Sequence, residues 1–215
     1  MRSMSGAGIN WSFSRRLHLD AGFCKPPTGF PGGLDSRYLL PSTLVIEGVS
    51  VTDATTRTIS DYASAVASGE PTPGGGSVIA TVAAFAAGLA EMVCHLTLSR
   101  PVEPQVSEAL TGAKTTAAQL RSRFLELASE DERAYGAYRE AARLPKATAE
   151  ERESRRDALE AALVGSADVP LQMASSCVEL LAALGAVGSL GTKHARADVQ
   201  TSLRLAEAAL KSAVT

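Results

Sequence analysis

Residues 104–142 read PQVSEALTGAKTTAAQLRSRFLELASEDERAYGAYREAA, and their apolar side chains recur at alternating steps of four and three. The stripe consists of Val106, Leu110, Ala113, Ala117, Leu120, Phe124 and Leu127. This spacing is typical of an amphipathic α-helix whose apolar side faces a core. The stripe continues through Asp131 to Ala134 and Tyr138, which predicts a long helix with one carboxylate on its core-facing side.

The segments on either side also have helical patterns. Residues 78–98 carry apolar or small side chains on every face, as in a helix that needs neighbours all round. A short amphipathic helix is expected over residues 59–66, and others over about 149–169, 171–184 and 194–211. Thr148 and Glu151 have the spacing of a capping box at the start of the second of these helices. Pro170 is expected to kink or restart the helix in which it lies, and a glycine-rich turn at 185–191 is expected to precede the last helix. No segment alternates like a strand, so the predicted fold class is all-α.

The composition restricts the classes of protein that fit. Hydrophobic residues make up 45% and aromatic residues 5% of the chain, so a core must consist of small and aliphatic side chains. The 21 basic and 23 acidic residues argue against a general nucleic-acid partner.

Cys24, Cys94 and Cys177 are too scattered for a zinc site or a disulfide framework, and no metal site is expected. The apolar stretch 78–90 is too short to span a bilayer, and a cytoplasmic protein is expected.

Two parts of the chain differ in composition. Residues 1–55 are rich in glycine and proline and have no lasting periodicity, which favours a disordered N-terminal extension or an over-long start. Residues 56–215 carry the helical patterns and are expected to form one domain.

The turn Pro71–Ser77, with the sequence PTPGGGS, lies directly before an expected helix. Its glycines allow a ligand to come close to the unpaired N–H groups of the helix N-terminus, where an anion is favoured. Candidate ligand-binding residues are Pro73, Gly74, Gly75, Gly76 and Ser77. The alternative is a tight turn that only lets two helices pack.

Asp131 is either a proton carrier with a shifted pKa, or a buried cap or ion pair. Lys146 lies in the break between two helices and either binds an anionic ligand or is solvated. Arg196 could clamp a carboxylate, and Asp198 falls in the first turn of the last helix, where an acid is favourable. Glu91 and His95 stand one turn apart and are expected to form a hydrogen-bonded pair.

These motifs together resemble the cyclodeaminase/cyclohydrolase family of folate one-carbon enzymes. The resemblance rests on the order and spacing of four segments across some 150 residues. They are SGEPTPGGGS at 68–77, LPK at 144–146 with EER at 150–152, VPL at 169–171 and RADVQ at 196–200.

The resemblance implies an up-and-down helical bundle that forms a homodimer with a folate groove between helices. It implies catalytic roles for Asp131 and Asp198, and substrate binding by Lys146 and Arg196. A tetrahydrofolate derivative is the implied substrate, and no tightly bound cofactor is expected. Thr192 and Ala197 differ from the family's usual asparagine and serine. The alternatives are therefore an inactive helical homodimer that binds folate or acts as a scaffold, and an unrelated alanine-rich bundle.

Overall fold

The computed structural model describes residues 56–215, and within that range it contains helices and no strand. Along these described residues lie α1 Ile59–Val66, α2 Gly75–Leu98, α3 Pro104–Arg143, α4 Ala149–Leu190, the short 3-10 helix η3 Lys193–Ala195 and α5 Arg196–Ala213. The all-α prediction is confirmed for this part of the chain. The expectations for residues 1–55 lie outside the described residues.

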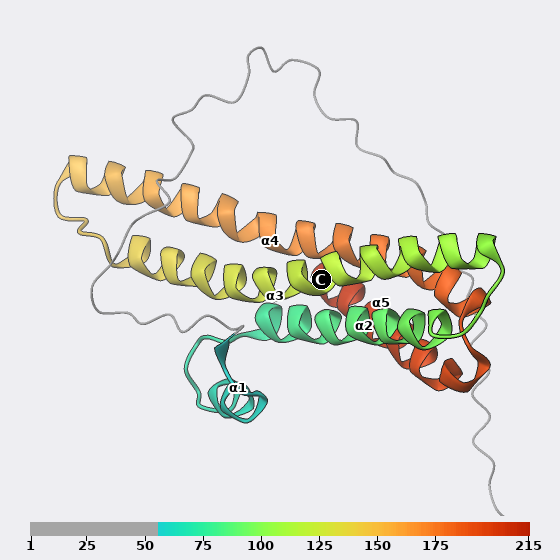
Figure 1. The fold of residues 1–215 in the computed structure, drawn as a ribbon. Helices are drawn as coiled ribbons and strands as arrows, with labels where there is room; N and C mark the ends of the chain where they lie inside the picture. The colour runs from blue at the N-terminus through green and yellow to red at the C-terminus, as the bar shows by residue number, and fades with distance from the viewer. Residues whose placement is uncertain (1–55) are drawn as a thin grey trace, which may run out of the picture. The chain divides into compact units, whose positions relative to one another are not determined.

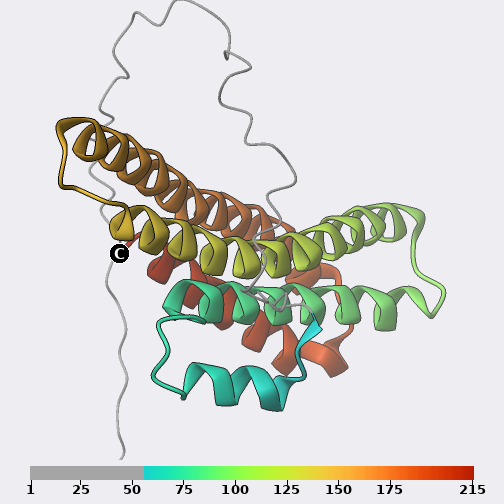
Figure 2. The same ribbon diagram turned by 90° about the vertical axis from the view of Figure 1, so that its left-hand side faces the viewer.

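Helices α2 to α5 form an up-and-down bundle (Figure 1). Both α2 and α4 pack against α3 and α5, and short connections reverse the chain between successive helices. Helix α1 lies beside the N-terminal end of α2, outside the bundle (Figure 2). It buries none of its residues, and Ile59 is 75% exposed.

The core combines the alanines of α2 with the predicted stripe of α3. Six alanines of α2 are buried, namely Ala80, Ala83, Ala84, Ala86, Ala87 and Ala90. Every stripe residue of α3 from Leu110 to Leu127 is buried as well, with Phe124 the largest of them. Because alanine methyl groups take little room, they allow the neighbouring helices to approach α2 closely between residues 80 and 90.

The stripe of α3 becomes exposed after Leu127, in contrast to the expectation from its periodicity. Asp131 and Ala134 are only half-buried, and Tyr138 is exposed. The reason is that α2 begins opposite Asp131, so that the rest of α3 runs past the end of α2 with α4 beside it (Figure 1).

A restart of the helix at Pro170 and a turn at residues 185–191 are both wrong, because α4 is one helix of 42 residues that runs through both. A proline costs a helix interior about 3 kcal/mol and a glycine about 1 kcal/mol. Against this, α4 buries a continuous face that consists of Val169, Met173, Cys177, Leu180, Leu184 and Val187. Each large apolar side chain contributes about 1.5–3 kcal/mol on burial, so tertiary packing outweighs the local preference.

The start of α4 confirms another local prediction. The Thr148 hydroxyl accepts the Glu151 N–H at 3.1 Å, and the Glu151 carboxylate accepts the Thr148 N–H at 3.1 Å. These two reciprocal bonds form a capping box.

Two of the described helices, α2 and α4, are long and apolar enough to cross a membrane by length and composition alone. The stretch 78–90 is thus part of a longer apolar helix, and its shortness no longer argues against a membrane. Half of the apolar window of α2 and 28% of that of α4 are buried inside the bundle, and two helices of this kind are weak evidence for a membrane protein.

The continuity of α4 is testable at Gly185. This residue is exposed in the helix, and a Cβ there would meet no atom within 4 Å. We expect Gly185→Ala to raise the free energy of unfolding by about 0.5–1 kcal/mol, because alanine is the better helix former. The control is Gly69→Ala, which should destabilise, since Gly69 has a φ of +82°. Loss of stability in Gly185→Ala, measured by urea denaturation, would indicate a turn at residue 185.

Candidate functional site

The first turn of α2 takes its cap from another helix. Its N-cap residue is Gly74, which has no side chain to satisfy the N–H groups of the turn. Instead, the Asp131 carboxylate of α3 accepts the Ser77 N–H, with 2.8 Å between Oδ2 and N. We call this contact the α2–α3 junction. It joins two of the motifs that the sequence singled out, the glycine turn and the core-facing carboxylate.

At the α2–α3 junction the Asp131 carboxylate leaves no room for a Cβ on residue 76, which is Gly76. A Cβ on Gly76 would lie 2.2 Å from Asp131 Oδ1 and 2.6 Å from Cγ, far inside van der Waals contact. Gly75 has no such neighbour within 4 Å, and a Cβ on Gly74 would be 3.6 Å from the Pro71 carbonyl oxygen. The glycines were predicted to admit an anion near the helix N-terminus, and the anion in this structure is the protein's own carboxylate.

Burial makes the Asp131 carboxyl a weaker acid than an exposed aspartate. Burial raises the pKa of the Asp131 carboxyl above its ordinary value of 3.8, and the hydrogen bond from the Ser77 N–H opposes this only in part. No basic side chain of residues 56–215 forms a salt bridge with it. Of the two structural readings of Asp131, the geometry supports a cap and not an ion pair. A carboxyl with a raised pKa is also suited to carry a proton.

A second carboxylate lies buried behind Asp131. Glu132 Oε1 accepts the Ser77 hydroxyl at 3.0 Å, and Glu132 Oε2 accepts a bond from Arg57 at 3.2 Å. The Tyr62 hydroxyl of α1 lies 2.7 Å from Ser77 Oγ. Ser77 is fully buried, so its side chain supports the junction and does not reach a groove.

Sequence reasoning missed Glu132, Arg57 and Tyr62 as parts of the site. A signal for Glu132 did exist, since it continues a second stripe of α3 through Leu125 and Ala128 at steps of three and four. Pro73, directly before the junction, is buried and follows a cis peptide bond from Thr72.

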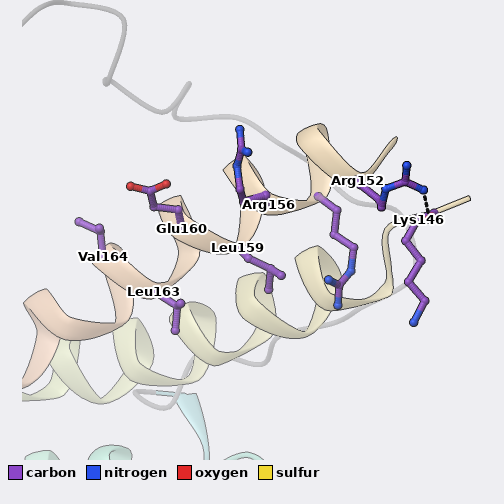
Figure 3. A pocket seen from close by; sticks show the side chains of 8 residues that line it. Lys146, Arg152, Arg156, Leu159, Glu160, Leu163 and Val164 are labelled. Atoms are coloured by element: carbon purple, nitrogen blue, oxygen red, sulfur yellow. Dashed lines mark hydrogen bonds between the residues drawn. The ribbon is translucent and has the colours of Figure 1, made fainter. Parts of the chain in front are cut away.

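Lys146 lies in the exposed turn between α3 and α4, at one end of the bundle. It lines a groove of about 540 Å³ together with Arg152, Arg155, Leu159 and Leu163. Figure 3 shows Leu163 directed toward α3 and Arg156 directed away from it. The groove thus combines an apolar floor with a basic rim.

Arg196 and Asp198 lie at the opposite end of the bundle, in the first turn of α5. Arg196 is exposed and lines a second groove of about 520 Å³ with Thr192 and Lys193. Helix α4 separates the two grooves, and its 42 residues measure about 63 Å at 1.5 Å per residue. One copy of the chain therefore brings Asp131, Gly76 and Ser77 together and leaves Lys146 and Arg196 far apart.

The remaining candidate pair, Glu91 and His95, lies on the exposed side of α2. His95 Nε2 is 3.7 Å from Glu91 Oε1, and Arg121 of α3 donates to Glu91 Oε2 at 3.0 Å. Within residues 56–215 no group of three His, Cys, Asp or Glu side chains is placed to hold a metal ion.

Comparison with known proteins gives a consistent result. Residues 58–215 match the family model described as formiminotransferase-cyclodeaminase. The chain is 32% identical to a methenyltetrahydrofolate cyclohydrolase of Methylorubrum extorquens over 156 residues, which cover 73% of this chain and 75% of that protein. It is 36% identical to the mouse formimidoyltransferase-cyclodeaminase over 139 residues, which cover 63% of this chain and only 25% of that longer protein.

A solved structure agrees with these relatives. The formiminotetrahydrofolate cyclodeaminase of Thermotoga maritima superposes with a TM-score of 0.65 at 25% identity. The match covers 74% of this chain and 76% of that one.

The crowding at Gly76 predicts a large effect from one methyl group. We expect Gly76→Ala to lower the free energy of unfolding by about 1–3 kcal/mol, because the methyl group must displace the Asp131 carboxylate. Gly75→Ala is the matched control and should cost nothing, since its methyl group enters open space. Chemical denaturation of both variants measures the difference. Equal stability of the two would mean that Asp131 does not lie over Gly76.

Proposed function

The chain belongs to the formiminotransferase-cyclodeaminase family, and on this premise we propose that it is a folate one-carbon enzyme acting on the bridge between N5 and N10 of tetrahydrofolate. Cyclodeamination closes 5-formimino-tetrahydrofolate to 5,10-methenyl-tetrahydrofolate with loss of ammonia. The cyclohydrolase reaction opens the methenyl ring with water. The names of the relatives support both reactions, and the homology favours an active enzyme over an inactive scaffold.

Asp131 is the proposed proton carrier. Both reactions pass through a tetrahedral carbon flanked by nitrogen atoms, and each requires a proton to be delivered to or taken from a nitrogen or a water. The observation that carries this assignment is the half-buried Asp131 carboxyl, which has a raised pKa and no salt bridge within residues 56–215. Such a group exchanges a proton nearer to neutral pH than an exposed aspartate does.

Two features support a homodimer, namely a set of exposed apolar side chains and the separation of Lys146 from Arg196. Uncovered apolar side chains lie on α4 on the side opposite its buried face. Val164, Leu171 and Val178 recur there at steps of seven and are 68%, 68% and 57% exposed. On α2, Phe85 is likewise 51% exposed. A second copy of the chain would remove these side chains from water, at about 1.5–3 kcal/mol for each that is fully buried.

The proposed pairing of α4 with its copy is antiparallel. Leu171 lies close to the middle of α4, so a two-fold axis near Leu171 is consistent with the symmetry of most dimers. Such an axis places the Lys146 end of one copy beside the Arg196 end of the other. Two basic groups from different copies could then hold the carboxylates of one folate, which a single copy cannot do across about 63 Å.

We expect Asp131→Asn to lower turnover by roughly two to four orders of magnitude, because the amide cannot carry the proton. Folate affinity should change little, since the carboxyl acts mainly in the transition state. The measurement is the ultraviolet absorbance of methenyl-tetrahydrofolate during its formation and hydrolysis. Glu140→Gln, which changes an exposed carboxylate of the same helix, should leave turnover unchanged.

Thermal unfolding of Asp131→Asn provides a second readout. When folding raises the pKa of a carboxyl, the folded protein loses stability as the pH rises from the ordinary pKa of that carboxyl to its raised pKa. The asparagine variant has no such loss of stability. The melting temperature of the variant minus that of the wild type should therefore be more positive at pH 7 than at pH 3. Wild-type turnover with a melting temperature depressed mainly at pH 7 would instead make Asp131 a structural anion.

The dimer is tested by Leu171→Glu, which places a charge in the middle of the proposed interface. We expect the mass of a single 22.3 kDa chain by light scattering, with helix content retained because Leu171 is exposed in the single copy. Ala208→Glu adds the same charge to an exposed position of α5 and should leave the dimer intact. A wild-type mass of one chain at micromolar concentration would contradict the dimer.

A further inference from the structure

Two neighbouring carboxylates of α3 are held by one residue of α2. The Ser77 N–H donates to Asp131 at 2.8 Å, and the Ser77 hydroxyl donates to Glu132 at 3.0 Å. A serine hydroxyl has one hydrogen and an ionised carboxylate only accepts. The Tyr62 hydroxyl, 2.7 Å from Ser77 Oγ, must therefore donate its own hydrogen to Ser77.

Ser77 is the first residue of α2 that has a side chain. Gly74, the N-cap, and Gly75 and Gly76, the first two helical residues, have no Cβ. They leave the turn with high backbone freedom and without side chains of their own to anchor it. The bond between the Ser77 hydroxyl and Glu132 is consequently the first side-chain contact that fixes this turn against α3.

We propose that Glu132 is a positioning residue for Asp131. By holding the Ser77 hydroxyl, Glu132 fixes the first turn of α2 in the place where the Ser77 N–H meets the Asp131 carboxylate. Nothing else in residues 56–215 donates a hydrogen bond of normal geometry to Asp131. Its orientation therefore depends on where Ser77 is held.

Glu132 is itself well supported. It is only 6% exposed, and a carboxylate buried to this extent is destabilising unless its oxygens are bonded. One oxygen accepts from Ser77 and the other from Arg57, which precedes α1. The segment before α1 and the start of α2 are thus tied to the same carboxylate.

The other charged groups near the junction are engaged elsewhere. Glu130 accepts two bonds from Arg123 on the side of α3 that faces α4, and Arg123 also contacts Gln172 of α4. From α1, the group at the junction is the Tyr62 hydroxyl. Asp131, Glu132 and Arg57 are accordingly the charged groups of the described residues that meet around Ser77.

The test uses the full-length chain and two measurements that do not require activity. The Asp131 carboxyl is titrated by carbon-13 NMR and identified by the signal missing in Asp131→Asn, and hydrogen exchange is measured at the Ser77 amide. In Glu132→Ala we expect exchange at Ser77 to become about ten-fold faster, since the bond to a charged acceptor loosens. Relative to Glu132→Gln, which removes the same charge, the Asp131 titration should lie at higher pH, because the bond that opposes the effect of burial weakens.

Three further variants complete the test. Glu132→Gln retains a carbonyl oxygen for the Ser77 hydroxyl, so it should reverse most of the faster exchange at Ser77 and have its Asp131 titration at lower pH than Glu132→Ala. Glu140→Ala should change neither the exchange nor the titration. Ser77→Ala keeps the backbone N–H but loses the hydroxyl, so it should shift the Asp131 titration to higher pH. If Glu132→Ala does not fold, the Asp131 titration in Ser77→Ala tests the proposal in its place. Equal Asp131 titrations in folded Glu132→Ala and Glu132→Gln, or an unchanged titration in folded Ser77→Ala, would overturn the proposal.

The effect on catalysis rests on the proposed function and is separable from it. In an active enzyme, the acid limb of the pH–turnover profile should lie at higher pH in Glu132→Ala than in Glu132→Gln. A wild-type protein without activity on either folate substrate would refute the proposed function alone. The titration of Asp131 would still decide whether Glu132 positions it.

Discussion

The contact between the Asp131 carboxylate and the first turn of α2 is the constraint on which the arrangement of this bundle depends. It sets the level at which α2 begins along α3, since Ser77 and Asp131 must meet at hydrogen-bonding distance. It requires glycine at position 76, where any side chain would collide with the carboxylate. It also leaves the last part of α3 without α2 beside it, and thereby exposes Tyr138.

The same contact explains why an acidic residue lies in an apolar stripe. A helix N-terminus without a side-chain cap presents unsatisfied N–H groups and the positive end of a dipole, and Asp131 satisfies one of these donors from a neighbouring helix. Burial nevertheless disfavours its charge more than the hydrogen bond favours it. A group in this balance can serve as a structural cap and as a proton carrier, so the two readings of Asp131 are compatible.

Much of the fold follows from local patterns, and the errors have identifiable causes. The stripe from Leu110 to Leu127 and the capping box at Thr148 depend on residues close in sequence, and both were predicted. Pro170 and Gly185 were misjudged, because the packing of α4 on α3 and α5 overrides their helix preferences. Glu132 continues an apolar stripe of α3, but its partners could not be predicted, because Arg57 and Ser77 lie 75 and 55 residues away in the sequence. The wide separation of Lys146 and Arg196 follows from the unbroken length of α4.

The alanine side of α2 also determines how the bundle responds to temperature. Alanine has no rotamers to lose on burial, so ordering the alanine positions of this helix costs almost no side-chain entropy. Each methyl group also exposes little apolar surface on unfolding, and apolar exposure is what raises the heat capacity of the unfolded state. A core of this kind gives a smaller heat-capacity change than a leucine core of the same length. At equal maximal stability, a smaller heat-capacity change gives a flatter stability curve.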